Sequence, residues 1–198
     1  MLARSGSAPP AKLKRICVFA GSRDGADPAY TEAAARLAEA IVAAGLGLVY
    51  GGGRVGLMGA VADAALAEGG EVIGVIPSAL QRREIAHRGL TELHVVDSMH
   101  ERKAMMAQLS DAFAALPGGF GTMDELVEAV TWSQLGIHSK PVGLLDVAGY
   151  WQPLRRLVDN AVDQGFVAPA GRDLLIWSDD PAELLTALGE WRSAPGPG

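Results

Sequence analysis

The amino-acid sequence predicts a single α/β domain built on a parallel sheet with helices on both faces. Short apolar runs alternate along the chain with longer stretches of helical pattern, and glycine-rich turns follow several of these runs. Such alternation indicates βαβ units, whose parallel strands are buried on both faces. With 198 residues, the chain is long enough for one domain with a sizeable core.

Short runs rich in β-branched and other apolar residues are predicted to be strands. In chain order they are Ile16–Phe19, Leu46–Tyr50, Val72–Ile76, Leu93–Val96, Ala112–Leu116, Val142–Leu145 and Leu174–Trp177. The stretches between and after them predict the helices Ala29–Ala44, Leu57–Glu68, His100–Leu109, Met123–Leu135, Tyr150–Gln164 and Pro181–Trp191. Because open α/β sheets bind ligands at the carboxyl ends of their strands, the strand-to-helix turns are where we expect the site.

The domain is expected to occupy residues 15–192. Residues 1–14 are rich in Ala, Ser, Pro and basic residues and lack the apolar segment of a signal peptide. Residues 193–198 are mostly Pro and Gly, which form neither helix nor strand. Both end segments are therefore expected to be disordered tails.

The composition and charge of the chain argue against several classes of protein. A net charge of −6 and a pI of about 5.2 argue against non-specific nucleic-acid binding, and no apolar run reaches the roughly 18 residues of a membrane span. The lone cysteine, Cys17, lies in a predicted strand and is expected to be a buried small hydrophobe. Since it has no partner for an intrachain disulfide, a cytoplasmic location is expected. Cys17 and the four histidines show no metal-ligand spacing, so we expect no metal.

Three strand-to-helix turns are unusual. They are Ala20–Arg23, which includes Ser22; Tyr50–Gly59, which includes Gly52 and Gly53; and Pro117–Glu125. Any one of them could be a tight turn that needs positive φ. Three such turns at equivalent ends of one sheet could line a single anion-binding crevice, because glycine lets backbone N–H groups approach an anion closely.

The second turn contains the spacing of a dinucleotide-binding motif at Gly51, Gly53 and Gly56. A dinucleotide site also needs an acid at the end of the next strand, and residues 74–78 contain none. NAD(P) binding is therefore disfavoured. The sequence of a P-loop is absent as well, which excludes that class of nucleotide-hydrolysing enzyme.

The third turn combines an anion-binding pattern with the acids Asp124 and Glu125. A structural alternative is a capping box, in which Thr122 caps the helix and Glu125 reaches back to the N–H of Thr122. That alternative leaves the preceding Pro-Gly-Gly-x-Gly unexplained. We therefore favour a site that holds a phosphate and performs acid–base chemistry beside it.

A charged cluster at residues 99–103 lies at the start of the predicted helix His100–Leu109. Cations at a helix N-terminus oppose the helix dipole, so Arg102 and Lys103 are easier to understand if they meet an anion or a carboxylate. The alternative is a solvated face. The basic stretch at residues 82–88 is either a solvated loop or a lid over the crevice.

Four ordered motifs together resemble the Lonely Guy family, whose members are cytokinin riboside 5′-monophosphate phosphoribohydrolases long labelled possible lysine decarboxylases. The motifs are Gly-Gly-Gly-x-x-Gly-Leu-Met-Gly (Gly51–Gly59), Met-His-x-Arg-Lys (Met99–Lys103), Pro-Gly-Gly-x-Gly-Thr-x-x-Glu (Pro117–Glu125) and Thr-Trp-x-Gln-Leu-Gly (Thr131–Gly136). The resemblance implies a Rossmann-like, doubly wound sheet and a homodimer. It also implies hydrolysis of the N-glycosidic bond of a nucleoside 5′-monophosphate, such as an N6-prenylated AMP, to free base and ribose 5-phosphate, without a cofactor.

Carried over by position, the resemblance implies that Arg102 and Glu125 form the catalytic pair. Substrate-contacting positions fall on Glu84, Lys103, the Gly119–Thr122 loop and Thr131. The candidate substrate-binding set as a whole is Ser22, Gly52, Gly53, Glu84, Arg102, Lys103, Gly118, Gly119, Phe120, Gly121, Thr122, Met123, Asp124, Glu125 and Thr131. Family members often have two glutamates where this chain has Asp124 and Glu125, so the role of Asp124 stays open.

The expected chemistry suits these residue types. Cleavage of an N-glycosidic bond builds positive charge on the ribose, which a carboxylate such as Glu125 can stabilise while it orients or deprotonates water. Arg102 can orient Glu125, neutralise phosphate charge or assist the departing base. The alternative from another class is a non-catalytic nucleotide-binding or carrier protein, because a fold alone does not determine function.

Overall fold

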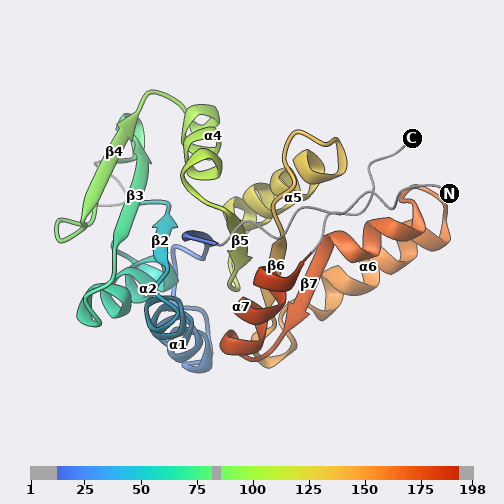
Figure 1. Ribbon diagram of the computed structural model, residues 1–198, viewed down its shortest axis with the longest axis horizontal. Helices are drawn as coiled ribbons and strands as arrows, with labels where there is room; N and C mark the ends of the chain where they lie inside the picture. The colour runs from blue at the N-terminus through green and yellow to red at the C-terminus, as the bar shows by residue number, and fades with distance from the viewer. Residues whose placement is uncertain (1–12, 82–85, 192–198) are drawn as a thin grey trace, which may run out of the picture.

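The computed structural model describes residues 13–81 and 86–191. Seven parallel strands form one sheet in the order β4-β3-β2-β1-β5-β6-β7 (Figure 1). They are β1 (Arg15–Phe19), β2 (Gly47–Tyr50), β3 (Val72–Pro77), β4 (Glu92–Val96), β5 (Ala112–Ala115), β6 (Val142–Leu145) and β7 (Leu175–Ser178). The predicted α/β class and parallel sheet are confirmed.

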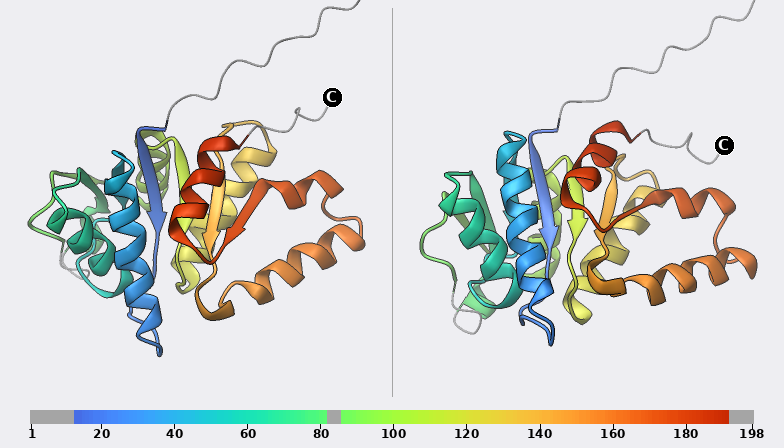
Figure 2. Two further views of the ribbon diagram at one scale, coloured as in Figure 1. Left: turned by 60° about the horizontal axis from the view of Figure 1, so that its bottom comes forward. Right: turned by 90° about the horizontal axis from the view of Figure 1, so that it is seen from below.

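Helices cover both faces of this sheet. They are α1 (Ala29–Ala43), α2 (Gly56–Ala67), α3 (Ser78–Gln81), α4 (Met99–Leu109), α5 (Phe120–Gln134), α6 (Gln152–Asp163) and α7 (Pro181–Glu190), with short 3₁₀ segments η1 (Val147–Gly149) and η2 (Pro169–Leu174). Helices α1, α2 and α7 lie on one face, and α4 and α5 on the other; α6 extends past the β7 edge (Figure 2). Within the described ranges, no helix is long and apolar enough to cross a membrane.

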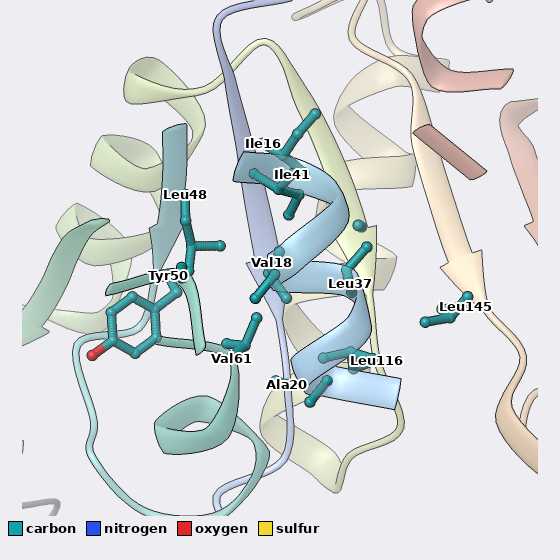
Figure 3. Packing of buried hydrophobic residues seen from close by; sticks show 14 of the residues in the cluster. Ile16, Val18, Ala20, Leu37, Ile41, Leu48, Tyr50, Val61, Leu116 and Leu145 are labelled. Atoms are coloured by element: carbon teal, nitrogen blue, oxygen red, sulfur yellow. The ribbon is translucent and has the colours of Figure 1, made fainter. Parts of the chain in front are cut away.

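Two apolar layers result from the alternation of side chains along each strand. In β1, Ile16 and Val18 belong to the cluster under α1 and α2, whereas Cys17 and Phe19 belong to the cluster under α4 and α5. Figure 3 shows part of the first of these layers, in which Leu37 and Ile41 of α1 belong to one cluster with Ile16 and Val18 of β1. Successive strand side chains point to opposite faces, so a strand covered on both sides is apolar throughout. Cys17 is fully buried, as predicted.

The sheet has its switch point between β1 and β5. From β1 the chain winds outward through β2 and β3 to β4 and then returns through α4, which crosses the sheet to reach β5. From β5 it winds the other way through β6 to β7. Open α/β sheets bind ligands beyond the carboxyl ends of their strands at such a switch point. Two of the three glycine turns follow β1 and β5.

Candidate functional site

The three glycine turns meet at the carboxyl ends of β1, β2 and β5. The Gly21 N–H donates to the Pro117 carbonyl at 3.1 Å, which joins the first turn to the third. The Met58 N–H donates to the Gly21 carbonyl at 3.2 Å, which joins the second turn to the first. The structure therefore places residues from three separate parts of the sequence in one continuous set of loops.

Some glycines in these loops are required by close packing. A Cβ on Gly118 would lie 2.1 Å from Thr122 Oγ1 and 2.9 Å from the Gly21 nitrogen. Gly56 has φ of +62°, and a Cβ there would lie 2.3 Å from the Arg23 nitrogen. At these positions a side chain would push the turns apart, because the contacts are with backbone or with a buried side chain.

Other glycines face open space. A Cβ on Gly119 or Gly121 would meet no atom within 4 Å, and neither residue has positive φ. Both residues are exposed and lie where α5 begins. The first N–H groups of a helix have no partner within the helix, and the helix dipole favours an anion there. The Gly119–Thr122 segment thus has the features of a helix N-terminus that can bind an anion.

The capping-box alternative for Thr122 and Glu125 is wrong. Helix α5 begins at Phe120, three residues earlier than predicted, and its N-cap is Gly119, which makes no side-chain capping bond. Thr122 therefore lies inside the first turn, where its side chain is buried. The sequence pattern places Phe120, Gly121 and Thr122 in the turn because Gly121 disfavours a helix, whereas these residues form the first turn of α5. A side-chain cap is present on α4 instead, where Ser98 Oγ accepts from the Glu101 N–H at 3.1 Å.

Arg102 and Glu125 face each other from α4 and α5. The Arg102 Nη2 lies 3.7 Å from Glu125 Oε1, and the two residues are only 5% and 8% exposed. Arg102 also donates from Nε to the Val75 carbonyl and from Nη2 to the Gly51 carbonyl, each at 3.2 Å. The guanidinium is thereby held at the ends of β2 and β3, with Glu125 oriented beside it.

This arrangement is better suited to chemistry than to stability. Removing two charges from water costs several kcal/mol per ion, and the attraction between them often only offsets that cost. In other proteins, replacement of a buried ion pair by well-packed apolar side chains is often neutral or stabilising. A buried carboxylate held beside a cation at the mouth of an anion-binding loop is instead a typical arrangement of acid–base and charge-stabilising catalysis.

Lys103 is engaged by carboxylates of α5. Its Nζ lies 3.0 Å from Asp124 Oδ2 and 2.8 Å from Glu128 Oε2. Burial lowers the pKa of Lys103, but the bonds to Glu128 and Asp124 outweigh it and raise the pKa above its ordinary value. Asp124 thus has a structural partner, and Lys103 holds α4 to α5 next to the buried pair.

The remaining predicted site residues are spread around this centre. Gly52, with φ of +75°, and Gly53 are buried in the second turn, and Ser22 is exposed in the first. Thr131 lies farther along α5 on its exposed face, where its hydroxyl donates to the Val127 carbonyl at 2.7 Å. A shallow hollow on this face is lined by Phe120, Met123, Asp124, Val127, Glu128, Thr131 and Trp132. Glu84 lies outside the described residues.

Two residues at the site were missed by sequence reasoning. Glu128 follows Glu125 by one helical turn, so helical spacing could have revealed it as a partner for Lys103. Tyr150, after η1, donates its hydroxyl to the Gly118 carbonyl. No sequence signal links Tyr150 to the third turn, because 32 residues separate it from Gly118.

In the part of the chain that the structure describes, no three His, Cys, Asp or Glu side chains gather where they could hold a metal ion. Both lysines of the core make polar contacts. Lys103 pairs with Asp124 and Glu128, and the Lys140 Nζ donates to the Ala107 carbonyl at 2.5 Å.

Comparison with known proteins places the chain in a family. Residues 58–188 match the model of the family described as possible lysine decarboxylase. The chain belongs to this family. A family relative from Arabidopsis thaliana, named cytokinin riboside 5′-monophosphate phosphoribohydrolase, is 50% identical over 91% of this chain and 83% of its own length. A relative from Oryza sativa subsp. japonica, named as a probable enzyme of the same kind, is 49% identical over 91% of this chain and 74% of its own. The resemblance to the Lonely Guy proteins is confirmed.

Solved structures share the family fold at lower identity. The molybdenum cofactor carrier protein of Chlamydomonas reinhardtii gives a TM-score of 0.67 at 23% identity, over 88% of this chain and 94% of that one. The molybdenum cofactor binding protein of Rippkaea orientalis gives 0.66 at 24% identity, over 88% and 96%. These likenesses confirm the Rossmann-like fold of a single domain.

Proposed function

We propose that this protein hydrolyses the N-glycosidic bond of a purine nucleoside 5′-monophosphate, with AMP or an N6-prenylated AMP as substrate. The products are the free base and ribose 5-phosphate. The observation that carries the proposal is the buried Arg102–Glu125 pair beside the open N-terminus of α5. Relatives about half identical to this chain and named phosphoribohydrolases support it.

The reaction divides between the two parts of the site. The N–H groups of the Gly119–Thr122 segment hold the 5′-phosphate and fix the ribose beside Glu125. As the bond from C1′ to the base nitrogen breaks, the electron pair leaves with the base and positive charge develops on the ribose, which Glu125 stabilises. Water then adds to C1′ and gives up a proton, and the base takes up a proton. The mechanism needs no metal or organic cofactor.

Arg102 has a defined part in this scheme. Its Nε and Nη2 are held by the Val75 and Gly51 carbonyls, so the guanidinium is fixed rather than free to follow the phosphate. We assign it the roles of orienting Glu125 and balancing its charge before the ribose cation forms.

The competing activities have weaker support. Decarboxylation with pyridoxal phosphate needs a lysine free to form a Schiff base, and Lys103 and Lys140 are both engaged. A carrier role remains the second candidate, because the fold is shared with cofactor carriers. The buried acid–base pair favours the enzyme, since a carrier needs an anion site but no carboxylate beside it.

We also propose that the protein is a cytoplasmic homodimer. Cytoplasmic location rests on the lone, buried Cys17. Dimerisation is supported by an apolar stripe along α5 and its C-cap, defined here as Phe120, Met123, Val127 and the C-cap Leu135, all of which are exposed large hydrophobic residues. At 100° per residue, these positions share one face of the helix, opposite the buried Leu126 and Ala129.

Turnover of AMP tests the enzyme directly. Purified protein should release free adenine and ribose 5-phosphate from AMP, identified by chromatography, and should cleave adenosine much less efficiently because adenosine lacks the anchoring phosphate. A carrier would be stabilised by AMP against thermal unfolding but would release no base. Equal kcat/KM for AMP and adenosine would contradict phosphate anchoring.

A further inference from the structure

Tyr150 contacts the third glycine turn from outside the family motifs. Its hydroxyl donates to the Gly118 carbonyl, although it belongs to the segment between β6 and α6. The ring is fixed by two edge-to-face contacts, with Trp151 at 4.9 Å and with Tyr30 at 6.0 Å between centroids. Trp151 itself is 1% exposed, and its backbone N–H donates to Asp146 Oδ1 at 2.8 Å. Tyr150 is therefore a rigid group that reaches a loop of glycines.

The atom that Tyr150 holds determines where a neighbouring donor points. The Gly118 carbonyl and the Gly119 N–H belong to one planar trans peptide unit, so they point in opposite directions. When the oxygen is bound by Tyr150, the N–H is directed to the other side. Without such a bond, glycines on both sides of the peptide would let this unit rotate at little cost.

The direction of the Gly118–Gly119 peptide matters because a phosphate is negatively charged. A carbonyl oxygen turned toward a phosphate would repel it, whereas an N–H would attract it. Gly119 borders open space, where an added Cβ would meet nothing within 4 Å, so its peptide has no packing to hold it on that side. On the other side, Gly118 packs against Thr122 and Gly21. The Tyr150 hydroxyl supplies the orientation that packing leaves open.

We propose that Tyr150 is a positioning residue for the phosphate-binding turn, which orients the Gly118–Gly119 peptide toward the 5′-phosphate without touching the substrate itself. This inference rests on the proposed function.

Tyr150→Phe tests the inference, because it removes the hydroxyl and retains both ring contacts. Loss of one hydrogen bond that orients a donor should weaken phosphate-dependent binding about three- to tenfold. We expect the Kd for ribose 5-phosphate, measured by calorimetry, and the KM for AMP to rise by this factor. We expect kcat for AMP, kcat/KM for adenosine and the melting temperature to stay close to wild type. A purely structural role would instead lower the melting temperature and affect both substrates alike.

Tyr30→Phe is the matched control, since it removes a hydroxyl from the ring that Tyr150 contacts edge-on. It should leave the Kd for ribose 5-phosphate unchanged. If wild-type protein binds ribose 5-phosphate and cleaves AMP, and Tyr150→Phe does both equally well, the positioning role is refuted and the proposed function stands. If wild-type protein does neither, both proposals are refuted.

Discussion

Glu125 and Arg102 carry opposite charges that the fold has removed from water on facing helices. The cost of burying them is offset in part by their mutual attraction and by the carbonyls of Gly51 and Val75, which accept from Arg102. A change at either residue therefore alters both stability and chemistry. Experiments at this pair must measure the two separately.

Glu125→Gln should lower kcat for AMP by about a hundredfold or more, since it removes the charge that stabilises the ribose cation and leaves the size unchanged. It should also cost about 1–3 kcal/mol of stability, because Arg102 loses a buried counter-charge. Steady-state turnover per folded molecule and thermal unfolding measure the two effects. Glu190→Gln, at the exposed end of α7, is the control for loss of one negative charge. Normal turnover by folded Glu125→Gln would place the catalytic carboxylate elsewhere.

Gly121→Ala should separate binding from folding. The structure has room for the methyl group, so stability should be unchanged or slightly higher. A methyl group at the helix N-terminus would crowd the phosphate, and we expect the KM for AMP to rise about tenfold with little change for adenosine. Gly189→Ala on α7 is the matched control, because its nearest neighbour lies 4.0 Å away and it is far along the chain from the turns. Unchanged KM in Gly121→Ala would show that the phosphate binds elsewhere.

At the scale of elements, α4 and α5 act as one unit. Lys103 of α4 pairs with Asp124 and Glu128 of α5, and the same two helices carry Arg102 and Glu125. The loop after α5 packs against the sheet through His138. There His138 lies against Phe113, with ring centroids 5.3 Å apart, and near Trp132 at 6.4 Å.

His138 should make the stability of this loop depend on pH. Burial, followed by the charge of Lys140, lowers the pKa of His138, and its Nδ1 already accepts from the Lys140 N–H at 3.2 Å. Because the folded-state pKa is depressed, the unfolded chain takes up the proton first as pH falls below about 6.5. Stability is therefore lost from about that pH downward and levels off below the folded-state pKa.

The measurement is the melting temperature from about pH 7.5 to about pH 5.5. Wild-type protein should lose more stability over this range than His138→Gln, which has no group that titrates at this position. Parallel curves for the two proteins would show that His138 does not contribute. Any decrease in melting temperature that wild type and His138→Gln share comes from other titratable groups.

For the whole molecule, the switch point between β1 and β5 lies at the proposed site, and the exposed apolar stripe along α5 is the surface at which we propose that two copies meet. Phe120 is 92% exposed and Val127 is 55% exposed, on a helix whose first turn belongs to the proposed phosphate site. A second copy on this face would cover apolar surface and lie next to the proposed active site.

Val127→Arg should convert a dimer to monomer, because a charge would be buried at the centre of the stripe. The fold of each chain should persist, since Val127 is exposed within one chain. Val95→Arg is the control: Val95 is 49% exposed and lies on β4 at the far edge of the sheet. Light scattering gives the mass. A wild-type mass of 20.6 kDa at all working concentrations would refute the dimer.

Much of this fold follows from local pattern. Strands and helices are predicted from patterns among neighbouring residues. Each predicted strand and each long helix therefore appears within a few residues of its expected place. The three glycine turns were recognised for the same reason. The predicted start of α5 is three residues too late because glycine disfavours a helix, whereas Gly119 is the N-cap of α5 and Gly121 lies in its first turn.

The pairing of side chains was decided by the tertiary structure. Arg102 and Glu125 were each singled out in the sequence, but their 3.7 Å approach depends on α4 crossing the sheet and α5 returning beside it. The engagement of Lys103 by Asp124 and Glu128, and the bond from Tyr150 to Gly118, likewise join segments that are distant in the chain. The sequence pattern thus determined which residue types and which turns lie at the carboxyl ends of the strands. Only the folding of those segments against one another determined which charges are buried together, because burial and contact are properties of the whole packed chain.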